Sequence, residues 1–182
     1  MKATDEAEFR EFMAARWPHL VRTAYLLTGD RHLAEDLAQT TLEKAAVSWP
    51  RVKSADDTDA YVRRILVNTH LARFRKRRVA EVLSPDLPDG AYGDQSQQIA
   101  QRDEVLAALV ALPRRQRAAI VLRFWEDLTE SQVAGILGCS VGTVRSQTHR
   151  ALQKLRTSPA LAETASERVP LSGVPTGKES VT

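Results

Sequence analysis

The chain has 182 residues, of which 43% are hydrophobic, 27% are charged and only 5% are aromatic. This balance is ordinary for a globular protein, and the length allows one domain or two small ones, because domains usually span about 50–250 residues. No apolar run approaches the roughly 20 residues that cross a bilayer, and the N-terminus is polar. These features exclude a membrane-spanning protein and predict a cytoplasmic one with no membrane partner.

The cysteine content and the charge distribution further narrow the classes of protein to which this chain can belong. The single cysteine, Cys139, cannot form a disulfide within the chain or build a thiolate zinc site, and we expect no metal or other cofactor. The net charge is +3, yet residues 61–79 hold seven basic side chains and no acidic one. Cations at a helix C-terminus would explain about two or three of them, so the segment is more typical of a polyanion-binding surface. The seven are Arg63, Arg64, Arg73, Arg75, Lys76, Arg77 and Arg78.

The first predicted domain spans residues 6–79 and consists of helices. Apolar residues recur three and four positions apart, which is the helical period, and scarce aromatic residues also favour helices over strands. Gly29 interrupts the pattern, and Asp30 is a suitable N-cap for the next helix. Residues 51–58 are predicted to form a loop, and Asp59 is predicted to cap a third long helix.

The second predicted domain spans residues 99–157. Residues 80–98, rich in proline, glycine and polar side chains from residue 84 onward, are predicted to be a flexible linker between the two domains. Residues 158–182 have little apolar content and are predicted to form a disordered tail. The expected fold class is therefore all-α, with two small helical domains joined by a flexible linker.

A helix-turn-helix is predicted inside the second domain. Thr129 and Gln132 have the spacing of a capping box, Gly138 supplies a tight turn, and Ser140 caps a second helix over residues 141–156. Arginine pairs with guanine through two hydrogen bonds, and serine or histidine donates to bases or phosphates, so a polar face on this second helix suits DNA. The side expected to face outward consists of Gly142, Arg145, Ser146, His149, Arg150 and Gln153.

Four stretches occur in a characteristic order: 25–30 (Tyr-Leu-Leu-Thr-Gly-Asp), 34–42 (Ala-Glu-Asp-Leu-Ala-Gln-Thr-Thr-Leu), 61–69 (Tyr-Val-Arg-Arg-Ile-Leu-Val-Asn-Thr) and 138–146 (Gly-Cys-Ser-Val-Gly-Thr-Val-Arg-Ser). Each alone is weak, but the ordered set is specific. Through them the chain resembles the extracytoplasmic-function sigma factors of bacterial RNA polymerase over about residues 6–156. It is most similar to their SigE-type actinobacterial subgroup.

The resemblance implies roles for particular residues. Asp36 and Gln39 match the helix that docks on the clamp helices of the large polymerase subunit. Asn68 matches a residue at the −10 element, where a base of the non-template strand is flipped into a pocket closed by the 49–60 loop. The implied −10 contacts are Arg64, Asn68, Arg75, Lys76 and Arg78, and the implied −35 contacts are Arg145, Ser146, His149 and Arg150.

The function that this resemblance implies is promoter recognition and transcription initiation, with core RNA polymerase and promoter DNA as partners and no catalysis. An anti-sigma protein commonly clamps such factors and is a candidate partner. One alternative is an autonomous helix-turn-helix repressor or activator, whose first domain would sense a signal or dimerise. A second is a small helical nuclease or phosphohydrolase that holds a metal at Asp56, Asp57 and Asp59, although no histidine ligand lies near these loop residues in the sequence.

Overall fold

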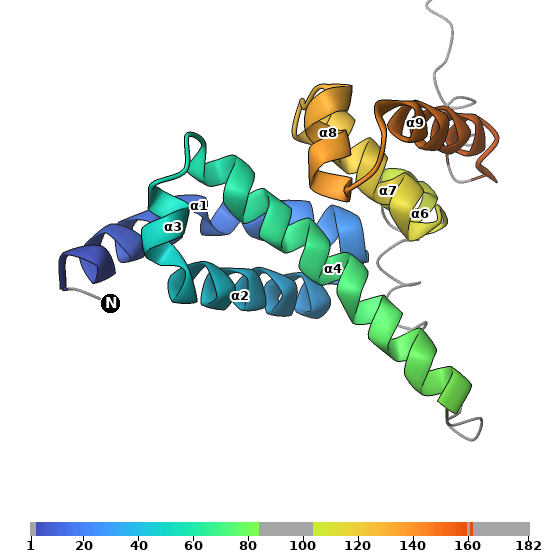
Figure 1. The fold of residues 1–182 in the computed structure, drawn as a ribbon. Coiled ribbons are helices and arrows are strands. Elements are labelled where there is room, and N and C mark those ends of the chain that lie inside the picture. Colours follow the sequence, from blue (N-terminus) through green and yellow to red (C-terminus); the bar gives the residue numbers. More distant parts are fainter. Residues whose placement is uncertain (1–2, 84–103, 160, 162–182) are drawn as a thin grey trace, which may run out of the picture.

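The computed structural model describes residues 3–83, 104–159 and 161, with side chains given up to Arg73 in the first of these ranges. All the elements in this part of the chain are helical, in agreement with the predicted fold class (Figure 1). The helices form two groups, one before and one after residues 84–103. Residues 84–98 of the predicted linker, and nearly all of the predicted tail, lie outside the described residues.

The first domain consists of α1 (Ala3–Thr28), α2 (Arg31–Val47), α3 (Trp49–Lys53) and α4 (Thr58–Leu83). The α1–α2 turn forms as the sequence predicted: Gly29 has φ +77, and Asp30 Oδ1 accepts the backbone N–H of Leu33 at 2.8 Å. Because this turn is tight, α2 folds back along α1, and α4 packs across both (Figure 1).

Three local predictions differ from the structure. The 51–58 loop is shorter than predicted, because Ser48 and Pro50 start the short helix α3. Asp57, not Asp59, caps α4 by accepting the backbone N–H of Ala60 at 2.8 Å. Asp59 instead pairs with Arg16 at 2.6 Å. Finally, α4 continues to Leu83, so that residues 80–83 are helical where the linker was expected to begin.

The second domain consists of α6 (Glu104–Val110), α7 (Arg114–Ile120), the π-helix η1 (Val121–Trp125), α8 (Glu130–Leu137) and α9 (Val141–Arg156). The helix-turn-helix prediction is confirmed. Thr129 and Gln132 form the capping box of α8, Gly138 is left-handed with φ +62, and Ser140 Oγ accepts the N–H of Thr143 at 3.1 Å to cap α9.

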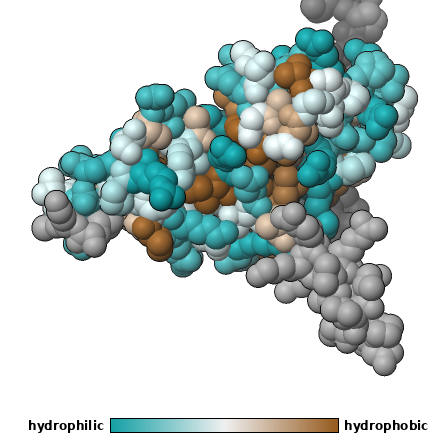
Figure 2. Space-filling view, in the orientation of Figure 1, coloured by the Kyte–Doolittle hydropathy of each residue, from teal (hydrophilic) through white to brown (hydrophobic). Residues whose placement is uncertain are grey.

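The two domains pack against each other. α1 contacts α6, α7 and η1, and α4 contacts α7 and α8. A single buried apolar cluster includes Leu27 and Leu66 of the first domain together with Leu122 and Val133 of the second. Figure 2 shows that hydrophilic side chains dominate the face in view, with apolar patches where the domains meet. A linker between two domains had been predicted, but a shared core between them had not.

Candidate nucleic-acid interface

The exposed face of α9 is the first candidate surface. Arg145, His149 and Arg150 are exposed, and Ser146 is half-buried with its hydroxyl donating to the Thr143 carbonyl at 2.9 Å. The opposite face is anchored in the core, because Val144 and Ala151 are fully buried. The helical spacing therefore separates a buried face from a cationic one as the sequence predicted.

Arg145 is positioned by the first helix of the motif. Its Nε donates to Glu130 Oε2 at 2.6 Å, and the Arg145 side chain remains 70% exposed. An ion pair this exposed contributes little to stability, because water screens both charges. The guanidinium can therefore exchange Glu130 for a phosphate or a guanine.

The second candidate surface lies on α4. Asn68 and Arg64 are exposed and line a cleft of about 1030 Å³. Lys44 and Tyr61 also line it, and Lys44 Nζ donates to Thr69 Oγ1 at 2.9 Å. From the second domain, the residues that line the same cleft are Arg114, Arg115 and Leu137. A single exposed amide thus lies among several cations, which is a suitable arrangement for holding phosphates and reading one base edge.

Not all seven basic residues of the 61–79 segment belong to this surface. Arg63 is half-buried and pairs with Glu126 Oε2 at 2.7 Å, and Arg73 pairs with Asp36 Oδ2 at 2.7 Å. Both therefore neutralise carboxylates of this chain. The side chains of Arg75, Lys76, Arg77 and Arg78 lie outside the described part of α4.

The predicted docking residues lie on the outer face of α2. Asp36 is 62% exposed even though it pairs with Arg73, and Gln39 is exposed and donates to Glu43 Oε1 at 3.1 Å. Both side chains can be reached by a partner. An arginine of that partner would compete with Arg73 for the Asp36 carboxylate.

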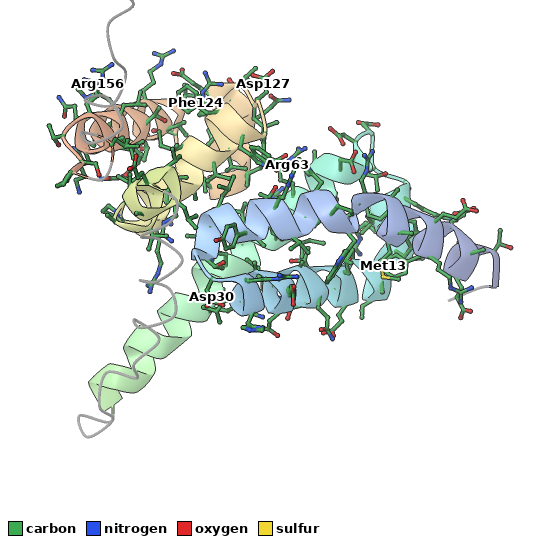
Figure 3. The ribbon with its side chains drawn as sticks, turned by 180° about the vertical axis from the view of Figure 1, so that it is seen from behind. Met13, Asp30, Arg63, Phe124, Asp127 and Arg156 are labelled. Carbon is green, nitrogen blue, oxygen red and sulfur yellow. The ribbon has the colours of Figure 1, made fainter. Side chains whose placement is uncertain are left out.

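A buried carboxylate joins the two domains. Glu126 follows η1, and its side chain is 2% exposed. Thr23 Oγ1 donates to its Oε1 at 2.6 Å, His19 Nε2 lies 3.0 Å from the same oxygen, and Arg63 Nε donates to its Oε2. Figure 3 places Arg63 at the junction of the domains. The neighbouring Trp125 also reaches α1, where its indole N–H donates to Thr23 Oγ1 at 3.1 Å.

A buried guanidinium forms a second link. Arg117 is 7% exposed and donates to the Leu27 carbonyl of α1 at 2.7 Å, to the Leu112 carbonyl at 3.2 Å, and to the Val110 carbonyl. It therefore satisfies carbonyl groups at the ends of α1 and α6 that the helices leave open. Gly29 also allows α1 and α6 to approach each other here, since a Cβ at this position would clash with Val110 Cγ2.

The metal alternative finds no support in the described ranges. These residues contain no group of three or more histidine, cysteine, aspartate or glutamate side chains that could hold a metal ion. Asp57 and Asp59 are accounted for by the α4 cap and the Arg16 ion pair.

Among the helices that the structure describes, none combines the length and the apolar character that crossing a membrane requires.

Comparison with known proteins agrees with the two-domain architecture. The family model for sigma-70 region 2 matches residues 13–79, and the model for sigma-70 region 4 matches residues 102–155. The RNA polymerase sigma-E factors of Streptomyces avermitilis and Streptomyces coelicolor are each 38% identical over 82% of this chain, and the match covers 83% and 84% of those proteins. The ECF sigma factor EcfG of Rhodopseudomonas palustris is 34% identical over 85% of this chain and 86% of its own length. The chain belongs to the extracytoplasmic-function sigma factors.

Solved structures support the same fold. The sigma factor RpoE of Bartonella quintana, in complex with the anti-sigma factor NepR, matches with a TM-score of 0.66 and 27% identity, over 85% of this chain and 97% of that one. CnrH in complex with the cytosolic domain of CnrY has a TM-score of 0.55 at 23% identity, over 87% of this chain and 90% of that one. In this sigma factor, region 2 thus corresponds to α1–α4 and region 4 to α6–α9.

The ionisable groups between the regions have shifted pKa values. Burial, followed by the charges of Arg117, Arg114 and Arg73, lowers the pKa of His70 from 6.5 to about 4. Burial, with Arg114 nearby, lowers the pKa of Arg117 to about 10. Burial alone would raise the pKa of Glu126, but the hydrogen bonds from Thr23 and His19 and the Arg63 charge outweigh it and lower that pKa. At neutral pH, His70 is neutral while Arg117 and Glu126 are charged.

The sigma factor is expected to lose stability in mild acid because of His70. The unfolded chain binds a proton at His70 below pH 6.5 and the folded chain only below about pH 4, so the contribution is complete above pH 6.5 and is lost between these values. The loss amounts to roughly 3 kcal/mol. Urea unfolding at pH 7 and pH 4.5 measures it. His70→Gln should flatten the pH dependence, whereas His32→Gln, at an exposed site, should not. If the free energy of unfolding fell by the same amount between pH 7 and pH 4.5 in wild type and in His70→Gln, this assignment would be contradicted.

Sequence reasoning missed the residues that join regions 2 and 4. Glu126 lies in an ordinary polar turn, and Arg117 is one of several arginines in the 114–117 run. No motif marks either residue as buried, and Glu126 has no helical period that would place it. The only available signal was indirect: Arg117 falls on the same helical face as apolar neighbours, where a charged residue needs a partner.

Proposed function

We propose that this sigma factor binds core RNA polymerase, reads the −35 element with α9 and the −10 element with the Asn68 face of α4, and directs transcription initiation. The observation that carries the proposal is the occurrence of two separate exposed cationic faces, one in region 2 and one in region 4. An autonomous repressor needs only the α9 face. The protein acts by binding alone, in the cytoplasm where the chromosome lies, and needs no cofactor.

The contacts have distinct tasks in this proposal. Arg145, His149 and Arg150 bind the −35 duplex, with Ser146 beside them. Asn68 binds a base of the melted non-template strand, while Arg64 and the cations further along α4 (Arg75, Lys76 and Arg78) hold phosphates. Opening is driven by differential binding, because capture of the single strand offsets the few kcal/mol that unstacking a base costs.

Two protein partners are part of the proposal. Asp36 and Gln39 of α2 dock on core polymerase, supported by their exposure on one helix face. An anti-sigma protein is a further partner, supported by the similarity to RpoE, which was solved together with the anti-sigma factor NepR.

Transcription in vitro tests the proposed function. Purified protein and core polymerase are incubated with genomic DNA, and the 5′ ends of the transcripts are sequenced. We expect start sites that share one motif near −10 and another near −35, and core alone serves as the control. Start sites indistinguishable from those of core alone would contradict the proposal and favour the autonomous repressor.

Arg145→Ala is expected to reduce initiation at those promoters about 10- to 100-fold, because a bidentate arginine–guanine contact discriminates by about 1–3 kcal/mol. Arg22→Ala, an exposed arginine of α1, is the matched control and should retain wild-type output. Run-off transcription measures the output of each variant on one mapped promoter and on a version of that promoter with a substituted −35 element. If Arg145→Ala lowered output equally on both templates, Arg145 would not read the −35 element.

A further inference from the structure

A carboxylate of this chain lies against the arginine that is proposed to read the −35 element. Glu130 begins α8, and its Oε2 accepts the Nε–H of Arg145 on α9 at 2.6 Å. The Glu130 side chain is 33% exposed and that of Arg145 is 70% exposed, so DNA can reach both. Among the proposed −35 contacts, Arg145 is the one that pairs with a carboxylate of the residues that the structure describes.

We infer that Glu130 is a positioning residue that sets the specificity of Arg145: its charge disfavours a phosphate as the partner of Arg145 and leaves the neutral edge of guanine favoured. This inference rests on the proposed function, in which Arg145 binds the −35 duplex. It concerns the choice between specific and non-specific DNA. Glu130 acts through Arg145 and needs no DNA contact of its own.

The hydrogen bond leaves available the part of Arg145 that can read a base. Its Nε is bonded to Glu130, and no other residue in the described ranges forms a hydrogen bond with its two Nη atoms. Guanine presents two acceptors, O6 and N7, in the major groove, and a guanidinium contacts both with two N–H groups. Nη1 and Nη2 can supply these donors while Nε stays on Glu130. The ion pair also restricts the arginine before it binds, which reduces the entropy lost on binding.

A phosphate is a different partner because it carries a full negative charge. To bind Arg145, it must lie beside the Glu130 carboxylate or displace it, and like charges at such short range repel each other. The O6 and N7 atoms of guanine are neutral acceptors and avoid most of this repulsion. The pair of Glu130 and Arg145 also has no net charge, so it contributes little to counterion release, which drives binding to any DNA sequence.

Stability of the fold does not account for this contact. An ion pair with this exposure adds little to stability, because water screens both charges. The N-terminus of α8 has its capping box from Thr129 and Gln132 without Glu130. A negative charge in the first turn of a helix adds only a small favourable interaction with the helix dipole. Removing the charge of Glu130 should therefore leave α8 folded and change mainly what Arg145 binds.

DNA binding by the full chain in complex with core polymerase tests the inference. Equilibrium affinity for a mapped promoter duplex is compared with affinity for the same duplex carrying a replaced −35 element. Glu130→Gln keeps an oxygen for the Nε–H of Arg145 but removes the charge. It should bind the replaced duplex about 3- to 10-fold more tightly with little change on the promoter, so discrimination between the two falls by that factor. On the replaced duplex, the slope of log affinity against log salt concentration should steepen by about one, the equivalent of one more phosphate contact.

Three further variants show whether the effect belongs to this contact. Asp127→Asn removes a negative charge from an exposed site three residues away and should change discrimination by less than about twofold, because screened charges act weakly at a distance. In an Arg145→Ala background, Glu130→Gln should have no further effect on discrimination. Glu130→Ala removes the hydrogen bond as well and should also weaken promoter binding. It decides the question if circular dichroism shows that Glu130→Gln is unfolded. Wild-type discrimination and salt slope in the folded variants, or an equal effect of Glu130→Gln without Arg145, would overturn the inference.

Binding of the free chain to a duplex without promoter sequence separates this inference from the proposed function, because it requires neither core polymerase nor a promoter. Absence of promoter-specific transcripts with the wild-type protein would overturn the function. A steeper salt slope in Glu130→Gln on the non-promoter duplex would then still assign Glu130 to the exclusion of phosphate. Promoter-specific transcripts together with unchanged discrimination in Glu130→Gln would overturn the inference alone.

Discussion

Replacing Asn68 by alanine is expected to reduce promoter opening by this sigma factor about 10- to 100-fold, the discrimination that two hydrogen bonds to one base provide. The side chain is exposed and lies in the cleft with Arg64 and Lys44, so its loss removes base contact without disturbing the core. Binding to core polymerase and to the −35 duplex should remain unchanged, because neither uses this face of α4.

Permanganate reactivity of unpaired thymines measures opening, and filter binding at low temperature measures the closed complex. A template melted in advance over the −10 region should still bind the variant more weakly than wild type. Glu11→Gln, at an exposed position of α1 outside the cleft, serves as a control. Normal opening by Asn68→Ala would refute the assignment of the −10 contact to Asn68.

Replacing Arg117 by methionine is expected to lower the free energy of unfolding by about 3 kcal/mol. Methionine fills much of the apolar volume but leaves the carbonyls of Leu27, Val110 and Leu112 without their guanidinium donor. Each buried acceptor without a partner costs about 1–3 kcal/mol, partly recovered where water enters. Because Leu27 lies in α1, the variant weakens the contact between regions 2 and 4 as well as region 4 itself.

Urea unfolding at pH 7 measures this change, with Arg115→Met as the control. Arg115 is exposed, and its replacement should shift stability by less than about 0.5 kcal/mol. The pKa of His70 provides a second readout, since the Arg117 charge helps to lower it and Arg117→Met should raise it. If the free energy of unfolding of Arg117→Met differed from that of wild type by no more than the Arg115→Met control does, the three carbonyls would not depend on Arg117.

Local features of this sigma factor could be predicted from the sequence because their causes are local. A capping box needs only Thr129 and Gln132, a left-handed turn needs Gly138, and the period of apolar residues separates the buried and exposed faces of α9. Errors arose where two local solutions compete. Asp57 and Asp59 are both possible caps, and the ion pair of Asp59 with Arg16, which lies on another helix, leaves Asp57 as the cap of α4.

The domain arrangement depends on contacts between residues far apart in the chain. Glu126 and Arg117 are ordinary charged residues in the sequence, and their partners are more than 60 positions away in Arg63 and Leu27. Similarly, the basic run of residues 61–79 predicted a DNA surface, but tertiary contacts divide it: Arg63 and Arg73 neutralise carboxylates, while Arg64 stays exposed. The sequence by itself determined the helical fold class, the helix-turn-helix with the caps at Thr129 and Ser140, and the family. Only the tertiary structure decided which charges are buried between regions 2 and 4, because burial of a charge depends on partners that the fold brings together.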